Sequence, residues 1–441
     1  MNIVAADATR RAFCARFSGL HTWSVAGQFS VSWNWAEEFV KPLSSILLRR
    51  SEVALEGMAP ETLVNLLTIR FDGSIEAREP VRICDVKGRL FRVHPGDVVF
   101  SKIDVRNGAI GCAPNDIPLM CVTAEFPVYS VNDSEADSNY VKLLFRTDAF
   151  RKILNSMISG ASGRKRIQPS QLEAIKVPIP SMSSQRKIVD HWLNAVQARV
   201  AVEDAQSNLV SELNEWLVRK TNLYSQVIGS KVFVARYENA QQWDAKAGRA
   251  AAFIAANPDF VRLGDYTEEC TDIIKPWAEP DKEWMIYGVN NRGSVFLSSR
   301  QRGCEFNAPY KIIKENWFFH NPTRANVGSL GIVPSVPKES ITSPEYQVWR
   351  LKGGLTPGFV AILLRTEYFL SLVEFSRVGG VKQRMYYSNL AEIRLPIIPE
   401  KVQRYFSARW RRIASQLARA ETRLKDRRLD VEDMIIGLKR A

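Results

Sequence analysis

Two glycine-rich basic loops carry the side chains with the clearest chemical meaning in this chain of 441 residues. The first reads SGASGRKR at 159–166 and sets main-chain amides beside Arg and Lys, a combination that binds phosphate. The second holds Lys382, Gln383 and Arg384, followed by Tyr386. Arg and Gln make paired hydrogen bonds to guanine and adenine edges in the major groove. These residue types favour a nucleic-acid partner, and an ordinary solvated loop is the alternative.

The candidate DNA contacts lie in these two loops and in one polar turn of each half of the chain. The turn residues are Lys102, Arg106, Arg324 and Asn326. The loop residues are Gly160, Ser162, Gly163, Arg164, Lys165, Arg166, Lys382, Gln383, Arg384 and Tyr386.

The patterns expected of an enzyme fail in this sequence. Asn321-Pro322-Thr323-Arg324 lacks the second proline and the aromatic residue of the turn by which amino-methyltransferases stack a flipped base. Residues 160–165 do not have the spacing of a phosphate-binding loop. The six cysteines form no C-x-x-C pair and the four histidines are far apart. We therefore expect no catalytic residues, no metal and no cofactor bound by this chain.

Self-comparison indicates that the chain contains two copies of one unit. GDVVFSKIDVRNGAIG (96–111) aligns with NWFFHNPTRANVGSLG (316–331), and FRTDAF (145–150) aligns with LRTEYF (364–369). SQLEAIKVPIP (170–180) aligns with SNLAEIRLPII (388–398), so the offset stays between 218 and 220. Strand-sized apolar runs alternate with turns in each copy, and a helical pattern follows. Each copy is therefore predicted to be a β-rich domain followed by a helix.

The two helical patterns have apolar residues at the alternating spacing of a coiled coil. At 1.5 Å per residue, about 40 residues span roughly 60 Å, which is too long for the stripe to be hidden inside one β-rich domain. We expect the stripes to bury each other in an antiparallel pair, and two unrelated helices on separate cores are the alternative. The predicted seam is Val189, Leu193, Val196, Val200, Val210, Leu217, Phe406, Trp410, Ile413, Leu417, Leu424, Val431 and Leu438.

The predicted fold class is α+β, with two repeated β-rich domains separated by a pair of long antiparallel coiled-coil helices. The domains are predicted at 39–182 and 231–398, and the helices at 183–230 and 399–441. Residues 1–38 are predicted to be an extension that packs on the first domain. Within it, apolar residues alternate with polar ones from Trp23 to Trp35, which predicts one or two strands.

The bulk composition is that of a folded protein with a polyanionic partner. Hydrophobic residues make up 46% of the chain, yet no apolar run is long enough to span a membrane. No secretory signal is recognisable at the start, so a cytoplasmic location is expected. The formal charge of +13 favours DNA, because a basic surface releases condensed counterions when it binds phosphates.

The segment SGASGRKRIQPSQLEAIKVPIPSMSSQRKIVD (159–190) resembles the DNA specificity subunit of type I restriction–modification systems. HNPTRANVGSLGIV and RYENAQQWDAKAGR are similar to further segments of that family. The resemblance covers about 39–441. It departs from the family at SNLAEIRLPIIPEKVQ, where the usual proline–glutamine helix start is missing.

The resemblance implies a non-catalytic subunit with two target recognition domains, each reading half of a bipartite double-stranded DNA site. The helices would set the gap between the half-sites. The implied partners are two adenine methyltransferase subunits that use S-adenosylmethionine, and restriction motor–nuclease subunits that use ATP and Mg²⁺. Two alternatives remain open: a coiled-coil scaffold with two protein-binding domains, and a specificity subunit of a different methyltransferase–nuclease system. The DNA sequence recognised and the gap length do not follow from the residues.

Overall fold

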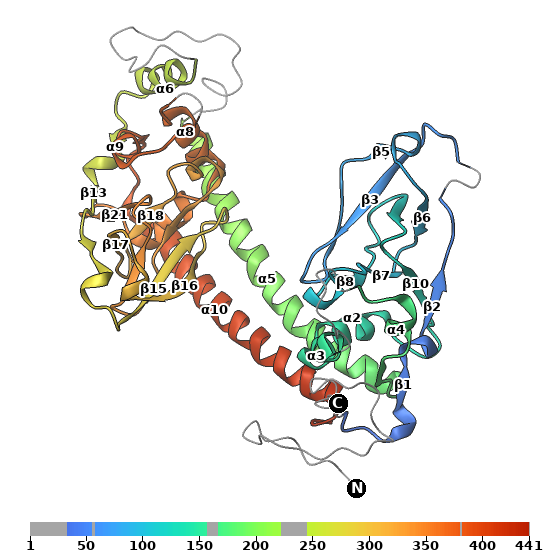
Figure 1. Cartoon of the computed structure of the whole chain (residues 1–441). Helices are drawn as coiled ribbons and strands as arrows, with labels where there is room; N and C mark the ends of the chain where they lie inside the picture. The colour runs from blue at the N-terminus through green and yellow to red at the C-terminus, as the bar shows by residue number, and fades with distance from the viewer. Residues whose placement is uncertain (1–32, 55–57, 157–165, 222–244, 380–381, 441) are drawn as a thin grey trace. The chain divides into compact units, whose positions relative to one another are not determined.

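The computed structural model describes residues 33–54, 58–156, 166–221, 245–379 and 382–440 (Figure 1). The chain divides into two compact units, 1–198 with 420–441 and 199–419. Each unit combines several sheets with short helices and with parts of two long helices. The predicted α+β class with two β-rich domains and long helices is confirmed.

The first unit contains three sheets. Their orders are β1-β11, β2-β10-β7-β8 and β4-β3-β9-β6, with β5 paired to β3. The strands are β1 (Val40–Pro42), β2 (Leu47–Arg50), β3 (Leu63–Ile69), β4 (Ile75–Ala77), β5 (Val81–Arg82), β6 (Leu90–Val93), β7 (Val98–Phe100), β8 (Ile110–Cys112), β9 (Met120–Thr123), β10 (Val128–Val131) and β11 (Lys176–Pro178). The helices are α2 (Ser138–Arg146), α3 (Asp148–Ser156) and α4 (Pro169–Glu173), with 3-10 turns η2 (Glu37–Phe39), η3 (Leu43–Ser45), η4 (Ile83–Asp85) and η5 (Val105–Asn107).

The second unit repeats this topology. Its sheets have the orders β12-β22, β13-β21-β18-β19 and β14-β17-β20-β15-β16. The strands are β12 (Val261–Arg262), β13 (Thr267–Glu269), β14 (Ile273–Ile274), β15 (Glu283–Val289), β16 (Val295–Arg302), β17 (Tyr310–Ile312), β18 (Phe318–His320), β19 (Leu330–Ile332), β20 (Ser340–Thr342), β21 (Gln347–Leu351) and β22 (Arg394–Leu395). The helices are α6 (Ala245–Ala256), α7 (Pro357–Leu363), α8 (Glu367–Ser376) and α9 (Tyr387–Ala391), with η8 (Leu263–Asp265), η9 (Pro276–Ala278), η10 (Gly303–Glu305) and η11 (Ala325–Val327).

The sheet orders agree with the duplication predicted from the sequence. In each unit, the four-stranded sheet has the same order of equivalent strands, and a parallel pair occurs at the same place, β3 with β9 and β15 with β20. The middle strands β7 and β18 are fully buried because apolar side chains cover both of their faces. These two strands lead into the polar turns that carry candidate DNA contacts.

Two long helices, α5 (Met182–Thr221) and α10 (Glu400–Ile436), each contribute to both units. In the first unit, Val189 of α5 shares a core with Val431 and Met434 of α10. In the second unit, Leu213 of α5 shares a core with Phe406 and Trp410 of α10. In both places the start of one helix meets the end of the other, so the helices run antiparallel.

The seam differs from the prediction in what its residues contact. The stripe ends are buried in the cores of the β-rich units, because both core clusters include residues of the long helices. Neither unit takes up the whole stripe: the first unit buries Val189 with Val431, and the second buries Leu217 with Phe406 and Trp410. Leu193, Val200 and Leu438 are 36%, 45% and 67% exposed, and Leu438 lies beyond the last residue of α10. Of the other predicted seam residues, several are only half-buried: Val196, Val210, Leu417 and Leu424.

A buried glutamine ties the start of each long helix to its own unit. The Gln185 amide oxygen accepts from Asp137 N at 2.8 Å, and its nitrogen donates to Glu135 O at 2.9 Å and Pro180 O at 2.8 Å. Gln403, the equivalent residue 218 positions later, is bonded in the same way. Its amide oxygen accepts from Thr356 N at 3.0 Å, and its nitrogen donates to Gly354 O at 3.0 Å and Ile398 O at 3.1 Å.

The segment before the first strand caps the end of α10. Asn34 N donates to Ile436 O at 2.8 Å, and the Asn34 amide donates to Gly437 O at 2.8 Å. The Trp35 indole donates to Ile435 O at 2.9 Å, so three carbonyls at the helix end find donors. Residues 33–36 form no strand, so the strand prediction is wrong for this part, and 23–32 lie outside the described residues. The reason is that these groups bond to a helix end instead of a sheet edge.

The buried glutamine can be tested by Gln403→Ala. The substitution leaves Thr356 N and two carbonyls without their partner, and we expect the free energy of unfolding to fall by about 2–3 kcal/mol. The control is Gln416→Ala, an exposed position on the same helix, which should change it by less than about 0.5 kcal/mol. Urea unfolding of the full chain measures both values, and equal values for the two variants would contradict the role of Gln403.

Candidate nucleic-acid interface

The polar turn that follows the central strand has the same backbone in both units. It runs through η5 between β7 and β8, and through η11 between β18 and β19. Each turn ends in a glycine with positive φ, Gly108 at 104° and Gly328 at 94°. A Cβ on Gly108 would lie 2.0 Å from Phe71 O, and one on Gly328 would lie 2.3 Å from Asn291 O. Glycine is therefore required on two grounds, and it lets a neighbouring turn pack closely.

In each unit an arginine contacts the neighbouring turn that packs against the glycine of the polar turn. In the first unit, Arg146 donates to Gly108 O at 3.0 Å and also to the carbonyls of Phe71 and Ile110. In the second unit, Arg365 donates to Gly293 O at 2.9 Å and lies over the Trp410 ring, 4.7 Å from its centre. Burial lowers the pKa of both guanidiniums, to about 10 for Arg365, so both remain charged at neutral pH. The sequence showed these arginines as part of the repeat, but their role was not predicted.

The end of each basic loop is joined to the polar turn by one main-chain hydrogen bond. Ile167 N donates to Lys102 O at 2.9 Å in the first unit, and Met385 N donates to Pro322 O at 2.8 Å in the second. The side chains of Ile167 and Met385 are buried beside these bonds. The structure thus brings the described end of each predicted loop next to the predicted turn, although about 60 residues separate them in sequence.

The last arginine of each loop pairs with an equivalent glutamate. Arg166 lies 3.5 Å from Glu125, and Arg384 lies 3.4 Å from Glu345. The four side chains are 38–67% exposed, although one oxygen of Glu125 is enclosed, and such pairs contribute less than about 1 kcal/mol. The pairs therefore orient the guanidiniums weakly, and a phosphate or base edge can displace the carboxylate at little cost.

In the second unit the basic loop ends in a small hairpin. Val378 N donates to Arg384 O at 2.9 Å, and Arg384 N donates to Val378 O at 2.8 Å. Gly379 adopts a φ of 110° at the start of this hairpin, and Arg377 donates to Gln383 O at 2.9 Å. Lys382 and Tyr386 are exposed beside these bonds. The hairpin therefore holds its backbone firmly while it presents these side chains to solvent.

The other predicted contacts differ in their exposure. Arg324 is exposed and Asn326 is half-buried on the same turn. Lys102 is half-buried, and its ammonium donates to Ala124 O at 2.7 Å, so it helps to fold the turn. Arg106 is half-buried, with its Nε atom enclosed. Five predicted residues lie outside the described residues: Gly160, Ser162, Gly163, Arg164 and Lys165.

A buried histidine under the second loop was not predicted as a site residue. The Trp349 indole donates to His320 Nδ1 at 3.3 Å, which leaves His320 Nε2 to donate to Met385 O at 2.9 Å. Burial lowers the pKa of His320 from 6.5 to about 4, so the ring is neutral at physiological pH. The repeat places His320 opposite Phe100. This difference between the copies is the feature of the sequence that could have marked His320 as a residue with its own role.

Residues 87–210 match a family model, the type I restriction modification DNA specificity domain. The family resemblance seen in the sequence is confirmed for this segment. The matched segment contains the first polar turn, the first basic loop and the start of α5. Comparison of the sequence with curated proteins gives no match.

Solved structures of specificity subunits are similar over most of their length. An HsdS subunit from Thermoanaerobacter tengcongensis is 15% identical and has a TM-score of 0.31, with 90% of this chain and 94% of that chain covered. A type I restriction–modification S subunit from M. genitalium is 12% identical and has a TM-score of 0.42, with 92% and 95% covered. A structure described for complex assembly of a type I R-M system is 17% identical and has a TM-score of 0.33, with 90% and 97% covered.

Two other kinds of feature are absent from the described ranges. His, Cys, Asp and Glu do not gather there in groups of three that could hold a metal ion. Among the helices in those ranges, none has both the length and the apolar character needed to cross a bilayer.

The buried histidine predicts a specific pH dependence of stability. Between pH 6.5 and 4 the unfolded chain binds a proton at His320 that the folded chain excludes, so stability falls as pH decreases through this range. From pH 7 to pH 5 the loss should be about 2 kcal/mol. His320→Phe, which introduces the first unit's residue, should remove this part of the pH dependence. Urea unfolding of both proteins at the two pH values tests it, and parallel pH profiles would show that His320 does not titrate as described.

Proposed function

We propose that this chain is the DNA specificity subunit of a type I restriction–modification complex, with each β-rich unit reading one half of a bipartite site. One observation carries the proposal: the residue that follows each basic loop, Ile167 or Met385, is bonded to the equivalent polar turn in both units. The family match over 87–210, which contains the first of these surfaces, supports it. Two equivalent surfaces on one chain suit two half-sites on one duplex.

The side chains of the two surfaces suggest which DNA groups each unit contacts. Arg166 and Arg384 are equivalent, and each carries a weakly held guanidinium that suits a phosphate or a guanine edge. Two other equivalent pairs differ in chemistry, with Lys165 opposite Gln383 and Arg106 opposite Asn326. Because Gln and Asn suit adenine while Lys and Arg suit guanine or phosphate, we propose that the two half-sites differ in sequence.

The long helices are proposed to set the gap between the half-sites. α5 has 40 residues, which corresponds to roughly 60 Å of helix, and each base pair adds about 3.4 Å along a duplex. Helix length can thus be converted into a fixed number of base pairs. The antiparallel pairing supports this role, because two helices packed together bend less than one.

The chain is proposed to direct catalysis that other subunits perform. Adenine methyltransferase subunits, which use S-adenosylmethionine, and restriction subunits, which use ATP and Mg²⁺, would bind to it. Exposed apolar residues on the long helices support a docking role, including Leu193 at 36%, Val200 at 45% and Leu429 at 59% exposure. A protein partner that covers these residues would remove their apolar surface from water.

The half-site assignment is tested by replacing Lys382, Gln383 and Arg384 with alanine. The variant is co-expressed with its methyltransferase subunit, and modified adenines are mapped along genomic DNA. We expect one half of the methylated motif to relax, because each paired base contact contributes about 1–3 kcal/mol of discrimination. The other half should remain as in the wild type.

Two further variants complete this experiment. Arg166→Ala should relax the opposite half of the motif, since it lies in the first unit. Lys338→Ala, an exposed cation between β19 and β20 of the second unit, should leave both halves unchanged. Equal relaxation of both halves by either loop variant would refute the assignment of one unit to one half-site.

A further inference from the structure

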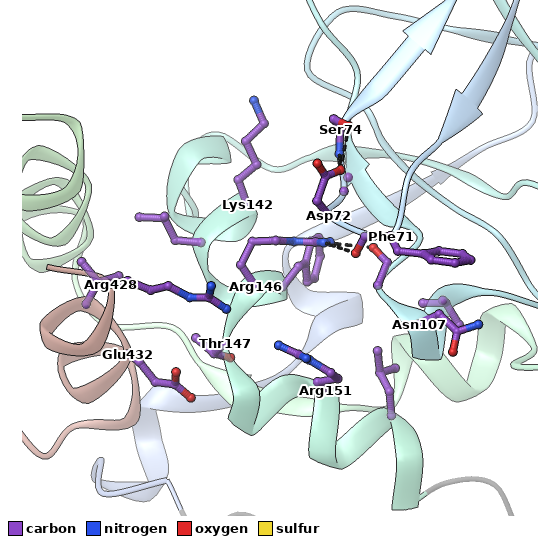
Figure 2. A pocket seen from close by; sticks show the side chains of 18 of the residues that line it. Phe71, Asp72, Ser74, Asn107, Lys142, Arg146, Thr147, Arg151, Arg428 and Glu432 are labelled. Carbon is purple, nitrogen blue, oxygen red and sulfur yellow. Dashed lines mark hydrogen bonds between the residues drawn. The ribbon is translucent and has the colours of Figure 1, made fainter. Parts of the chain in front are cut away.

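The first unit contains a pocket of about 500 Å³ behind its polar turn (Figure 2). It is bounded by the turns 71–74 and 105–108, by α2 and α3, and by the end of α10. A pocket of this volume matches a small organic ligand. Part of its wall is apolar, formed by Leu143, Leu154, Trp192 and Val431.

Four cations line this pocket, namely Lys142, Arg146, Arg151 and Arg428. The carboxylates that line it, Asp72 and Glu432, already have hydrogen-bond donors of their own. Asp72 accepts from Ser74 N at 2.9 Å and from Ser74 Oγ at 2.7 Å. Glu432 accepts from Asp148 N at 2.8 Å and Ala149 N at 3.2 Å, and so caps α3. The pocket therefore has a positive balance.

Figure 2 shows where the cations come from. Arg428 on α10 and Arg151 on α3 extend into the same space beside Arg146 of α2. Arg146 is committed to main-chain carbonyls, and Arg151 lies 2.6 Å from the exposed Asp148. Such an exposed pair is weak, so Arg151 can turn to a more strongly charged ligand.

The second copy provides an internal control for this pocket. By the repeat offsets, Ala361 stands opposite Lys142, Leu370 opposite Arg151, and Val210 opposite Arg428. Arg146 and Trp192 keep their types, as Arg365 and Trp410. In the second unit Val210 and Leu370 pack against the hydrophobic core. The fold thus needs the shared arginine, but it does not need the three additional cations of the first unit.

The residues that line the pocket indicate the chemical class of its ligand. Guanidiniums bind phosphate oxygens through paired hydrogen bonds, and Lys142 adds a further positive charge. The Trp192 indole, which is partly buried against the core, forms part of the pocket wall, and aromatic side chains can stack with a nucleobase. A mononucleotide combines a phosphate with a flat ring and suits a pocket of this volume. We propose that this pocket is a mononucleotide-binding site, with the phosphate on Arg151 and Arg428 and the base against Trp192.

The test measures binding of three probes to the full chain by isothermal titration calorimetry in the absence of DNA. Adenosine 5′-monophosphate should bind more tightly than inorganic phosphate, and adenosine should bind at least about tenfold more weakly than the nucleotide, since it lacks the charge. Arg151→Leu and Arg428→Val introduce the residues of the second copy and should each weaken nucleotide binding about tenfold or more. Lys425→Ala, an exposed position on α10, should bind like the wild type.

Several outcomes would overturn the proposal. They are no nucleotide binding by the wild type, equal binding of adenosine or of inorganic phosphate, and unchanged affinity in both pocket variants. A loss of duplex DNA affinity in these variants without nucleotide binding would make the pocket a contact for DNA phosphates, which also overturns it. Thermal unfolding confirms that the variants fold. Because the binding assay contains no DNA, its failure is separate from any failure of the proposed recognition function.

Discussion

The proposed DNA-binding surface of each unit depends on one main-chain hydrogen bond. It joins the end of the basic loop to the polar turn, from Ile167 N to Lys102 O and from Met385 N to Pro322 O. A loop with glycines and charged residues loses much conformational freedom when it binds DNA, and this bond removes part of that freedom in advance. The buried strands β7 and β18 position the turn, and the buried side chains of Ile167 and Met385 hold the loop in place.

The two copies together distinguish residues that maintain the fold from residues that are free to serve recognition. Equivalent residues that keep both type and contacts, such as Gln185 and Gln403, maintain the unit. Asn214 and Glu432 occupy equivalent positions on α5 and α10, and each accepts from the first amides of a short helix in its own unit. The loops, His320 and the pocket of the first unit include positions that differ in chemistry between the copies. These are the positions where one copy can acquire a property that the other lacks.

The repeat offsets in the sequence predicted the paired architecture because they compare the chain with itself and need no knowledge of packing. They could not predict which helix residues would be buried. Leu209 and Leu213 are fully buried although the expected seam omitted them. They are buried because they pack into the hydrophobic core of the second unit. Asn214 interrupts the apolar stripe because it caps α8. The pairing of Arg384 with Glu345 joins residues 39 positions apart, which spacing in the sequence does not indicate.

The central claim is that loop and turn together form a surface for the DNA backbone and bases. Its most direct test is the affinity of the full chain for duplex DNA measured over a range of salt concentrations. If cationic side chains neutralise several phosphates, the logarithm of the affinity should fall linearly with the logarithm of the salt concentration, with a slope of about −0.9 for each phosphate contact. A weak affinity with almost no dependence on salt would contradict the account.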